Sequence, residues 1–214
     1  MKQILVYSDS ISWGLIPGTR QRLPITKRWC GIMQTTLSSH GLNIQLAENC
    51  LNGRRSAWAD PQKDGRNGSI GLAQLIEAHS PLNLVIILLG TNDFQAMHNA
   101  DAAACSAAIA SLIDIIRNAP IEPGMPVPDI LIVCPPAINN PVGELAVKFT
   151  GAEIKSIKLP QELAKIAQSK STYFFDANTV SRVSEIDGVH LDEQGQSCLG
   201  KALAEKLIKL KIFS

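Results

Sequence analysis

The sequence lacks an apolar stretch long enough to cross a membrane. Its longest uninterrupted apolar run extends only from Leu84 to Leu89, whereas a spanning helix needs about 20 consecutive apolar residues. Hydrophobic residues still make up 45% of the chain, which is enough to fill the core of a globular protein. We therefore expect a soluble, folded protein with no membrane partner.

The sequence also lacks an excess of charge of either sign. Its 20 Lys and Arg residues and 19 Asp and Glu residues give a net charge of +1, and no run of basic residues is longer than two. Proteins that bind nucleic acid usually concentrate basic residues on one face or along one helix. The even balance therefore argues against a nucleic-acid partner and favours a small molecule.

Cysteine is scarce and shows no metal-binding spacing. The chain has five cysteines, at positions 30, 50, 105, 134 and 198, and no pair forms a C-x-x-C motif. An odd number without such spacing is typical of free thiols in a reducing compartment. The apolar run Ile4–Tyr7 is too short for a signal peptide and is followed by Ser8-Asp9-Ser10 rather than by a cleavage site. We expect a cytoplasmic protein without a bound metal.

Strand-like and helix-like segments alternate along the chain. Five short β-type runs occur at Gln3–Tyr7, Asn43–Glu48, Leu84–Leu89, Asp129–Cys134 and Thr172–Asp176. Helical periodicity marks Trp29–His40, Asp101–Asn118, Glu153–Gln168 and Gln194–Leu210, and surface loops are predicted at Ile16–Lys27, Asp60–Ser69 and Pro120–Pro128. Uniformly apolar strands are typical of parallel sheets covered on both faces. We predict one α/β domain over residues 1–214: a flavodoxin-like, three-layer α/β/α sandwich with a five-stranded parallel sheet.

Residues that follow the strands are the candidates for a site, because ligands of such sheets bind at the carboxyl ends of the strands. Ser10 follows the first run and is a candidate nucleophile, while Asp9 is expected to brace its turn. Asp187 and His190 follow the last run as an orienting carboxylate and a base. The amide of Asn92 and the backbone N–H of Gly53 are candidate donors to an oxyanion. The other histidines, at positions 40, 79 and 98, are expected at the surface.

This set of residues, in this order, resembles the SGNH hydrolases, also called GDSL-type esterases and lipases. The first block is matched by Ser8-Asp9-Ser10-Ile11, the second by Gly53, the third by Gly90-Thr91-Asn92-Asp93, and the last by Asp187-x-x-His190. Ser8 and Ile11 depart from the usual Gly and Leu of the first block. The stretches 8–14 and 84–93, with the Arg28-Trp29 pair, are similar to the arylesterase and acyltransferase branch of that family.

The resemblance implies a serine esterase that needs no cofactor or metal. Ser10, Asp187 and His190 would form the catalytic triad, and the backbone N–H groups of Ser10 and Gly53 with the side chain of Asn92 would form the oxyanion hole. The branch implies short-chain, acetyl-type esters, with acyl transfer to alcohols as a second outcome. It also implies a homo-oligomer whose neighbouring subunits narrow the entrance to the site.

Three other functions are compatible with the same sequence. A carbohydrate O-acetyl esterase would use the same residues. A flavodoxin-like FMN-binding domain or an idle binding domain fits the fold, although the carboxylate of Asp9 would repel a phosphate. Trp13 and Phe94, and also Trp58, are candidates for a substrate platform. Arg54 and Arg55, next to Gly53, are expected either to steer acidic groups or simply to face solvent, and the second is favoured.

Overall fold

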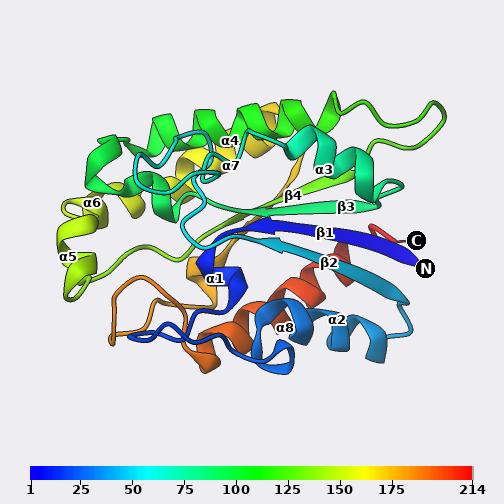
Figure 1. Cartoon of the computed structure of the whole chain (residues 1–214). Helices are drawn as coiled ribbons and strands as arrows, with labels where there is room; N and C mark the ends of the chain where they lie inside the picture. The colour runs from blue at the N-terminus through cyan, green and yellow to red at the C-terminus, as the bar shows by residue number, and fades with distance from the viewer. Residues whose placement is uncertain (214) are drawn as a thin grey trace.

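A single parallel sheet lies at the centre of the computed structural model, which describes residues 1–213 (Figure 1). Its five strands are β1 (Lys2–Ser8), β2 (Ile44–Cys50), β3 (Leu84–Leu88), β4 (Asp129–Cys134) and β5 (Tyr173–Asp176). They run in the order β2-β1-β3-β4-β5, and every neighbouring pair is parallel. Ser8 pairs with Cys50 on one side and with Leu88 on the other. The carboxyl ends of the three strands therefore meet at one edge.

Helices cover both faces of this sheet (Figure 1). One layer contains α2 (Trp29–Ser39) and α8 (Glu193–Leu210), and the other contains α3 (Leu72–His79), α4 (Ala102–Arg117) and α7 (Leu159–Ser169). The predicted three-layer α/β/α sandwich with five parallel strands is thus confirmed.

The buried residues of the central strands explain their unbroken apolar sequence. In β3, Val85 and Ile87 pack into the core on the α3, α4 and α7 side, whereas Ile86 and Leu88 pack into the core on the α2 and α8 side. Successive strand residues point to opposite faces, so a strand with a helical layer on each face needs apolar residues at every position.

The prediction of one continuous helix at Glu153–Gln168 is wrong. The structure has two helices there, α6 (Ala152–Ser156) and α7 (Leu159–Ser169), separated by Ile157 and Lys158. Pro160 stands in the first turn of α7. It has no N–H to bond to the carbonyl of Ser156, so a continuous helix would lose a hydrogen bond at that point.

Several short elements were not predicted. They are α3, the four-residue α1 (Ser10–Trp13) and the five-residue α5 (Glu144–Lys148). Segments this short contain too few turns for a periodic pattern to be recognised. The segments 60–69 and 120–128 lack helices and strands, as predicted. The segment 16–27 contains a 3₁₀ turn at Ile25–Lys27 and an isolated bridge from Arg22 to Leu15. Within residues 1–213, no helix has the length and apolar character needed to cross a bilayer.

The strand order reverses at β1. From β1 the chain passes to β2 on one side through α2, and then to β3 on the other side through α3. Connections that leave in opposite directions open a crevice at the carboxyl ends of the two inner strands. The loops after β1 and β3 therefore flank a natural ligand site.

Candidate active site

The nucleophile candidate lies in the tight turn after β1. Ser10 is the first residue of α1, and the side chain of Asp9 accepts a hydrogen bond from the backbone N–H of Ile11 at 2.9 Å. A short polar side chain at the start of a helix satisfies a free backbone donor in this way. Asp9 is fully buried and Ser10 is nearly so. The turn therefore holds the Ser10 hydroxyl in one place at the end of the strand.

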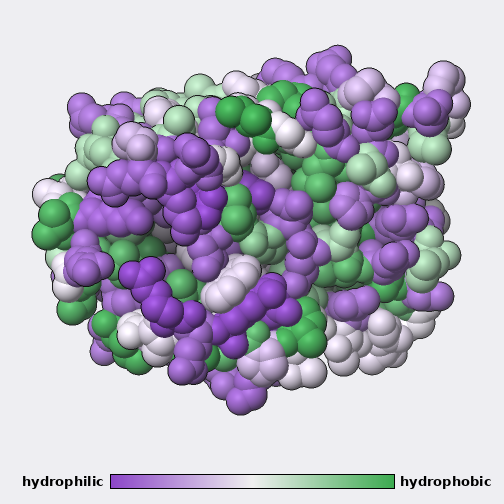
Figure 2. Space-filling model, viewed as in Figure 1, coloured by the Kyte–Doolittle hydropathy of each residue, from purple (hydrophilic) through white to green (hydrophobic). Residues whose placement is uncertain are grey.

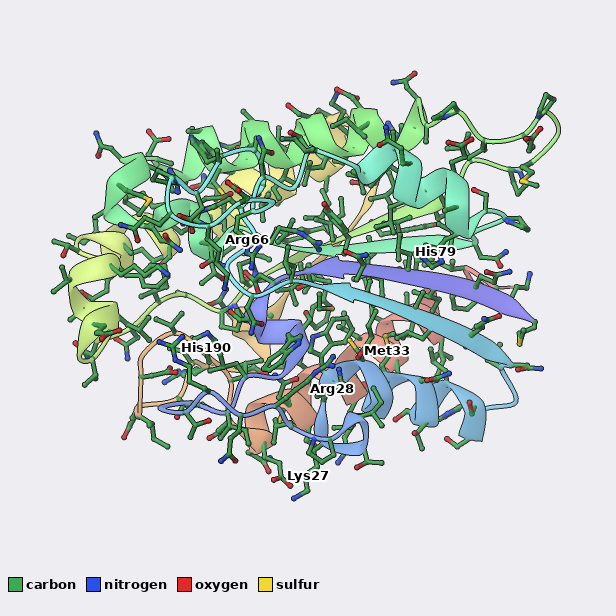
Figure 3. All side chains as sticks on the ribbon, in the orientation of Figure 1. Lys27, Arg28, Met33, Arg66, His79 and His190 are labelled. Carbon is green, nitrogen blue, oxygen red and sulfur yellow. The ribbon has the colours of Figure 1, made fainter. Side chains whose placement is uncertain are left out.

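His190 connects the Ser10 hydroxyl to the carboxylate of Asp187. The Nε2 atom of His190 lies 3.0 Å from Ser10 Oγ, and its Nδ1 atom lies 2.7 Å from Asp187 Oδ2. Figure 3 shows His190 beside α1, next to the loop that leads to α8. The two ring nitrogens thus face the two groups that a hydroxyl-activating base needs: a proton donor on one side and an orienting carboxylate on the other.

A tight turn brings Asp187 and His190 together. Asp187 Oδ1 accepts the backbone N–H groups of Val189 at 3.0 Å and of His190 at 2.9 Å. Gly188 has a φ of +73°, and a Cβ there would lie 2.4 Å from the carbonyl oxygen of Asn139. Only glycine fits both the backbone conformation and the space. Four consecutive residues therefore form the acid–base pair, and the carbonyl of Gly188 ties their turn to the backbone N–H of Asn139 at 3.0 Å.

The carboxylate of Asp187 is held in its charged form. Burial alone would raise its pKa, but the hydrogen bonds from the ring and backbone of His190 and from the backbone of Val189 lower the pKa to about 2. Asp187 is therefore ionised at neutral pH. A permanent negative charge at 2.7 Å from Nδ1 fixes the ring orientation and stabilises an imidazolium when one forms.

Two further groups, from the loops after β2 and β3, lie at the same edge. Gly53, with a φ of +81°, and Asn92, in a 3₁₀ turn at Thr91–Phe94, line one cavity together with Ser10, Asp187 and His190. The amide of Asn92 is held at both ends: its Nδ2 donates to Asp9 Oδ2 at 3.0 Å, and its Oδ1 accepts from Gln95 at 2.8 Å. One of the two Nδ2 hydrogens is left for a ligand.

Asp9 contributes more than the turn-bracing bond predicted from the sequence. One oxygen caps α1 and the other receives the Asn92 amide, so this carboxylate joins the loops after β1 and β3. Burial raises its pKa to about 6, opposed by the bond from Ile11, the nearby His190 and the bond from Asn92. Both oxygens of Asp9 therefore accept hydrogen bonds from the protein itself.

Arg55 is fully buried, and the expectation that it faces solvent is wrong. Its guanidinium donates to the carbonyl of Gly53 at 2.9 Å, to the carboxylate of Asp60 at 2.7 Å, to the side-chain oxygen of Gln95 and to Nε2 of His98 at 2.9 Å. A planar group with a fixed fork of donors can hold several loops in one geometry. Through Gln95 it reaches Asn92, so one side chain supports both oxyanion candidates.

The expectation that Arg54 faces solvent is also wrong, and His98, at the end of the 3₁₀ turn Ala96–His98, is less exposed than expected. Arg54 is buried, donates to the carbonyl of Ser8 at 2.9 Å, and lies over the ring of Tyr7 at 4.0 Å. His98 is half-buried, and burial and the nearby Arg55 lower its pKa. Sequence reasoning missed these contacts because each partner lies far along the chain or depends on how a loop closes.

The cavity around these residues has a volume of about 780 Å³ and opens to solvent. Figure 2 shows a hollow bordered by hydrophilic surface on the side of the molecule where α1 and α5 lie. Apolar side chains form part of the wall: Leu15, Val142, Leu145, Phe149, Ile186 and Val189. The space holds a small ester with room beyond the acyl group.

The structure does not bring Trp13 or Phe94 to this cavity. Phe94 is 1% exposed and packs in the core between β3 and the α4 side. The guanidinium carbon of Arg22 lies 5.0 Å from the centre of the Trp13 ring. Trp58 lies beside His98, with the two ring centres 6.1 Å apart. Closeness to a strand end in sequence did not show which way these rings turn. None of the six apolar wall residues, Leu145 and Phe149 included, was predicted from the sequence.

Comparison with known proteins places the chain among ester-cleaving enzymes. Residues 9–198 match the model of the GDSL-like lipase/acylhydrolase family. An arylesterase from Vibrio mimicus is 22% identical over 210 residues, covering 97% of this chain and 89% of the relative. Est24, a carbohydrate acetylesterase from Sinorhizobium meliloti, superposes with a TM-score of 0.92 at 29% identity, covering 98% of this chain and 100% of its own. The M. smegmatis aryl esterase has the same TM-score and coverage at 30% identity.

Proposed function

The chain belongs to the GDSL-like lipase/acylhydrolase family and is a carboxylic ester hydrolase, and we propose that it cleaves short-chain, acetyl-type esters through an acyl-enzyme on Ser10. The single observation that carries this proposal is the contact chain from Ser10 Oγ to His190 Nε2 at 3.0 Å and from Nδ1 to Asp187 at 2.7 Å. A hydroxyl is a weak nucleophile until a neighbouring base removes its proton.

In the acylation step, His190 takes the proton of Ser10 as the serine oxygen attacks the ester carbonyl. Asp187 holds the ring and stabilises the imidazolium that results. The imidazolium then gives its proton to the departing alcohol, which leaves an ester between Ser10 and the acyl group. His190 and Asp187 are both buried, so little water competes for these protons.

The developing oxyanion receives three hydrogen bonds in this proposal. The backbone N–H groups of Ser10 and Gly53 and the free Nδ2 hydrogen of Asn92 are the donors. The support is that all three residues line one cavity and that the Asn92 amide is fixed at both ends before substrate arrives. Donors that are already oriented stabilise charge without reorganising during the reaction.

The acyl-enzyme is released by water or by another alcohol, with His190 again as base. A small alcohol that enters the apolar part of the cavity competes with water for the acyl group, so both hydrolysis and transfer are expected. The preference for acetyl groups is supported by the arylesterase and carbohydrate acetylesterase relatives. A carbohydrate O-acetyl esterase is a second candidate, favoured by the polar side of the cavity, where Asn52 and Thr19 offer hydrogen bonds to sugar hydroxyls.

Subunit association and location are part of this proposal. Val142 and Ile186 line the cavity and are 53% and 64% exposed, and Val147, Ile154 and Ile157 are exposed on or next to α5 and α6. A second copy of the chain would bury such apolar side chains and narrow the entrance. Light scattering of the purified protein should give a mass above that of one chain.

The five cysteines are free thiols, which suits a reducing compartment.

The test of the proposed function is ester hydrolysis by Ser10→Ala. The wild-type enzyme should release p-nitrophenol from p-nitrophenyl acetate, and the variant should not exceed the rate left by binding and the oxyanion donors. Ser39→Ala, at an exposed serine at the end of α2, is the matched control and should keep full activity. A series of acetyl, butyryl and octanoyl esters then measures chain length. Retained activity in Ser10→Ala, or a large preference for octanoyl, would contradict the proposal.

A further inference from the structure

Three cationic side chains converge on the mouth of the cavity from separate segments. Arg20 follows α1, Lys63 belongs to the irregular segment before α3, and Lys148 is the last residue of α5; all three line the cavity. All three are exposed. Within residues 1–213, none of them makes a hydrogen bond or an ion pair with another side chain. Their charges are therefore available to a ligand.

The acidic residues of the cavity do not neutralise these cations. Asp60 is paired with the buried Arg55 at 2.7 Å, and Asp187 is bonded to His190. Glu144, at the start of α5, is the remaining lining carboxylate. Asp187 keeps its negative charge, but it is buried beside His190, so Glu144 is the exposed lining carboxylate that faces the three exposed cations. The whole chain has a net charge of only +1, so the excess of positive charge is local to the exposed part of the cavity.

Lys148 lies close enough to Lys63 and Arg20 for each of their charges to act on it. The pKa of Lys148 is lowered, first by burial and then by Arg55, with smaller effects of Lys63 and Arg20 in the same direction, while Asp60 opposes them. Like charges that are brought together weaken each other, and an anion placed among them relieves the repulsion. Cavities lined by one sign of charge also raise the local concentration of oppositely charged ligands.

We propose that the enzyme prefers esters whose alcohol portion carries a carboxylate, which Arg20, Lys63 and Lys148 bind at the cavity mouth. This inference rests on the proposed function, because it takes Ser10 as the reacting group. Ser10 is only 7% exposed. An acetyl group bound to it fills only the space next to this residue. The alcohol portion therefore extends through the rest of the roughly 780 Å³ cavity toward the exposed cations. Its uncharged part lies against the apolar wall that includes Leu145 and Phe149.

The test compares two substrates that differ only in charge far from the ester. 3-(4-Acetoxyphenyl)propanoate carries a carboxylate, and 3-(4-acetoxyphenyl)propanamide is its neutral isostere with an almost identical leaving phenol. We expect kcat/KM to be about tenfold higher for the carboxylate at low ionic strength, as three partly screened cations attract it. The preference should shrink as NaCl is added, while the rate with the amide stays constant. Equal rates for the two substrates would overturn the inference.

Variants identify the residues responsible. The triple variant Arg20→Gln, Lys63→Gln and Lys148→Gln should lose the preference for the carboxylate and keep its rate with the amide. The control is Lys201→Gln, Lys206→Gln and Lys209→Gln on α8, outside the cavity lining, which removes the same charge and should keep the preference. If both triple variants lose it equally, net charge is responsible and the inference is wrong.

The two proposals fail in distinguishable ways. If Ser10→Ala cleaves the ester bond of 3-(4-acetoxyphenyl)propanamide as fast as the wild type does, the proposed function fails. If hydrolysis depends on Ser10 but the carboxylate gives no advantage that depends on the three cations, only the preference for anionic esters fails. A lower KM for the carboxylate with an unchanged kcat would support binding at the mouth, away from the reacting atoms.

Discussion

The two sides of the reaction centre are built in different ways. Asp187 and His190 are three residues apart, and the bonds that set their geometry run within one turn, whose backbone is anchored to the segment 139–142. The opposite side joins Gly53, Asn92 and Asp9, from three different loops, and depends on the buried side chains of Arg55 and Gln95. The acid–base side is therefore a local motif, whereas the oxyanion side is a network that exists only in the folded protein. The motif residues of both sides can be recognised in a sequence, but the buried side chains that hold Gly53 and Asn92 in place cannot.

The largest expected effect comes from breaking the local side. Asp187→Asn keeps the size of the side chain but removes the charge and stabilises the wrong ring tautomer, so kcat for p-nitrophenyl acetate should fall by on the order of 10⁴-fold. Asp114→Asn, which removes an exposed carboxylate on α4, should leave the rate unchanged. A loss of less than tenfold in Asp187→Asn would show that His190 does not depend on this partner.

The next largest effect comes from removing one donor on the network side. Asn92→Ala should lower kcat by on the order of 10²-fold to 10³-fold with little change in KM, because the lost hydrogen bond strengthens mainly in the transition state. The pH dependence of the remaining activity should match that of the wild type, since the base is untouched. Asn43→Ala, at an exposed asparagine before β2, is the control. An unchanged kcat would remove Asn92 from the oxyanion hole.

A smaller loss is expected when the network is loosened without removing a donor. Arg55→Lys keeps the charge but loses the fork that joins Gly53 and Gln95, so kcat should fall by about 10-fold to 10²-fold through misplaced donors. If Arg55 acts through Asn92, the same substitution should cost much less in an Asn92→Ala background. Independent, multiplicative losses would show instead that Arg55 serves the fold and not the donors.

The smallest effect concerns stability at the junction of the two sides. The pKa of Asp9 is raised by burial to about 6, above its ordinary value of 3.8, so folding favours the protonated form. Its contribution to stability is present below pH 4 and is lost as the pH rises through 6. The free energy of unfolding should therefore fall over this range, by on the order of 1 kcal/mol more in the wild type than in Asp9→Asn. Asp93, whose pKa burial also raises to about 6, is present in both proteins. Chemical denaturation at pH 4, 5 and 6 measures the difference, and parallel curves would contradict it.

The features that the sequence predicts are those that depend on local patterns. The apolar strands and their order of helices and loops led to the observed sandwich, because burial on both faces leaves a pattern at every position of β3. The motif segments pointed to Ser10, Gly53, Asn92, Asp187 and His190, which the structure brings around one cavity; their chemical roles stay predictions. Local signals of this kind need no knowledge of the fold.

What could not be predicted depends on contacts between distant segments. Arg55 looks like any surface arginine in sequence, and its burial becomes clear only when Asp60, Gln95 and His98 close around it. Phe94 follows a strand that ends at the site, yet its ring turns into the core. Leu145 and Phe149 reach the cavity from a short helical segment that has no periodic signal. Side-chain direction and loop closure are decided by packing, which a single sequence does not display.

The position of β1 between β2 and β3 has a consequence for how the enzyme responds to heat. An inner strand with partners on both edges opens only when the whole sheet opens, whereas the irregular segments around the cavity can open alone. Amide hydrogens next to the nucleophile should therefore exchange with solvent far more slowly than those of the cavity mouth. Moderate warming should therefore loosen the segments around the cavity while Ser10 keeps its place at the end of β1.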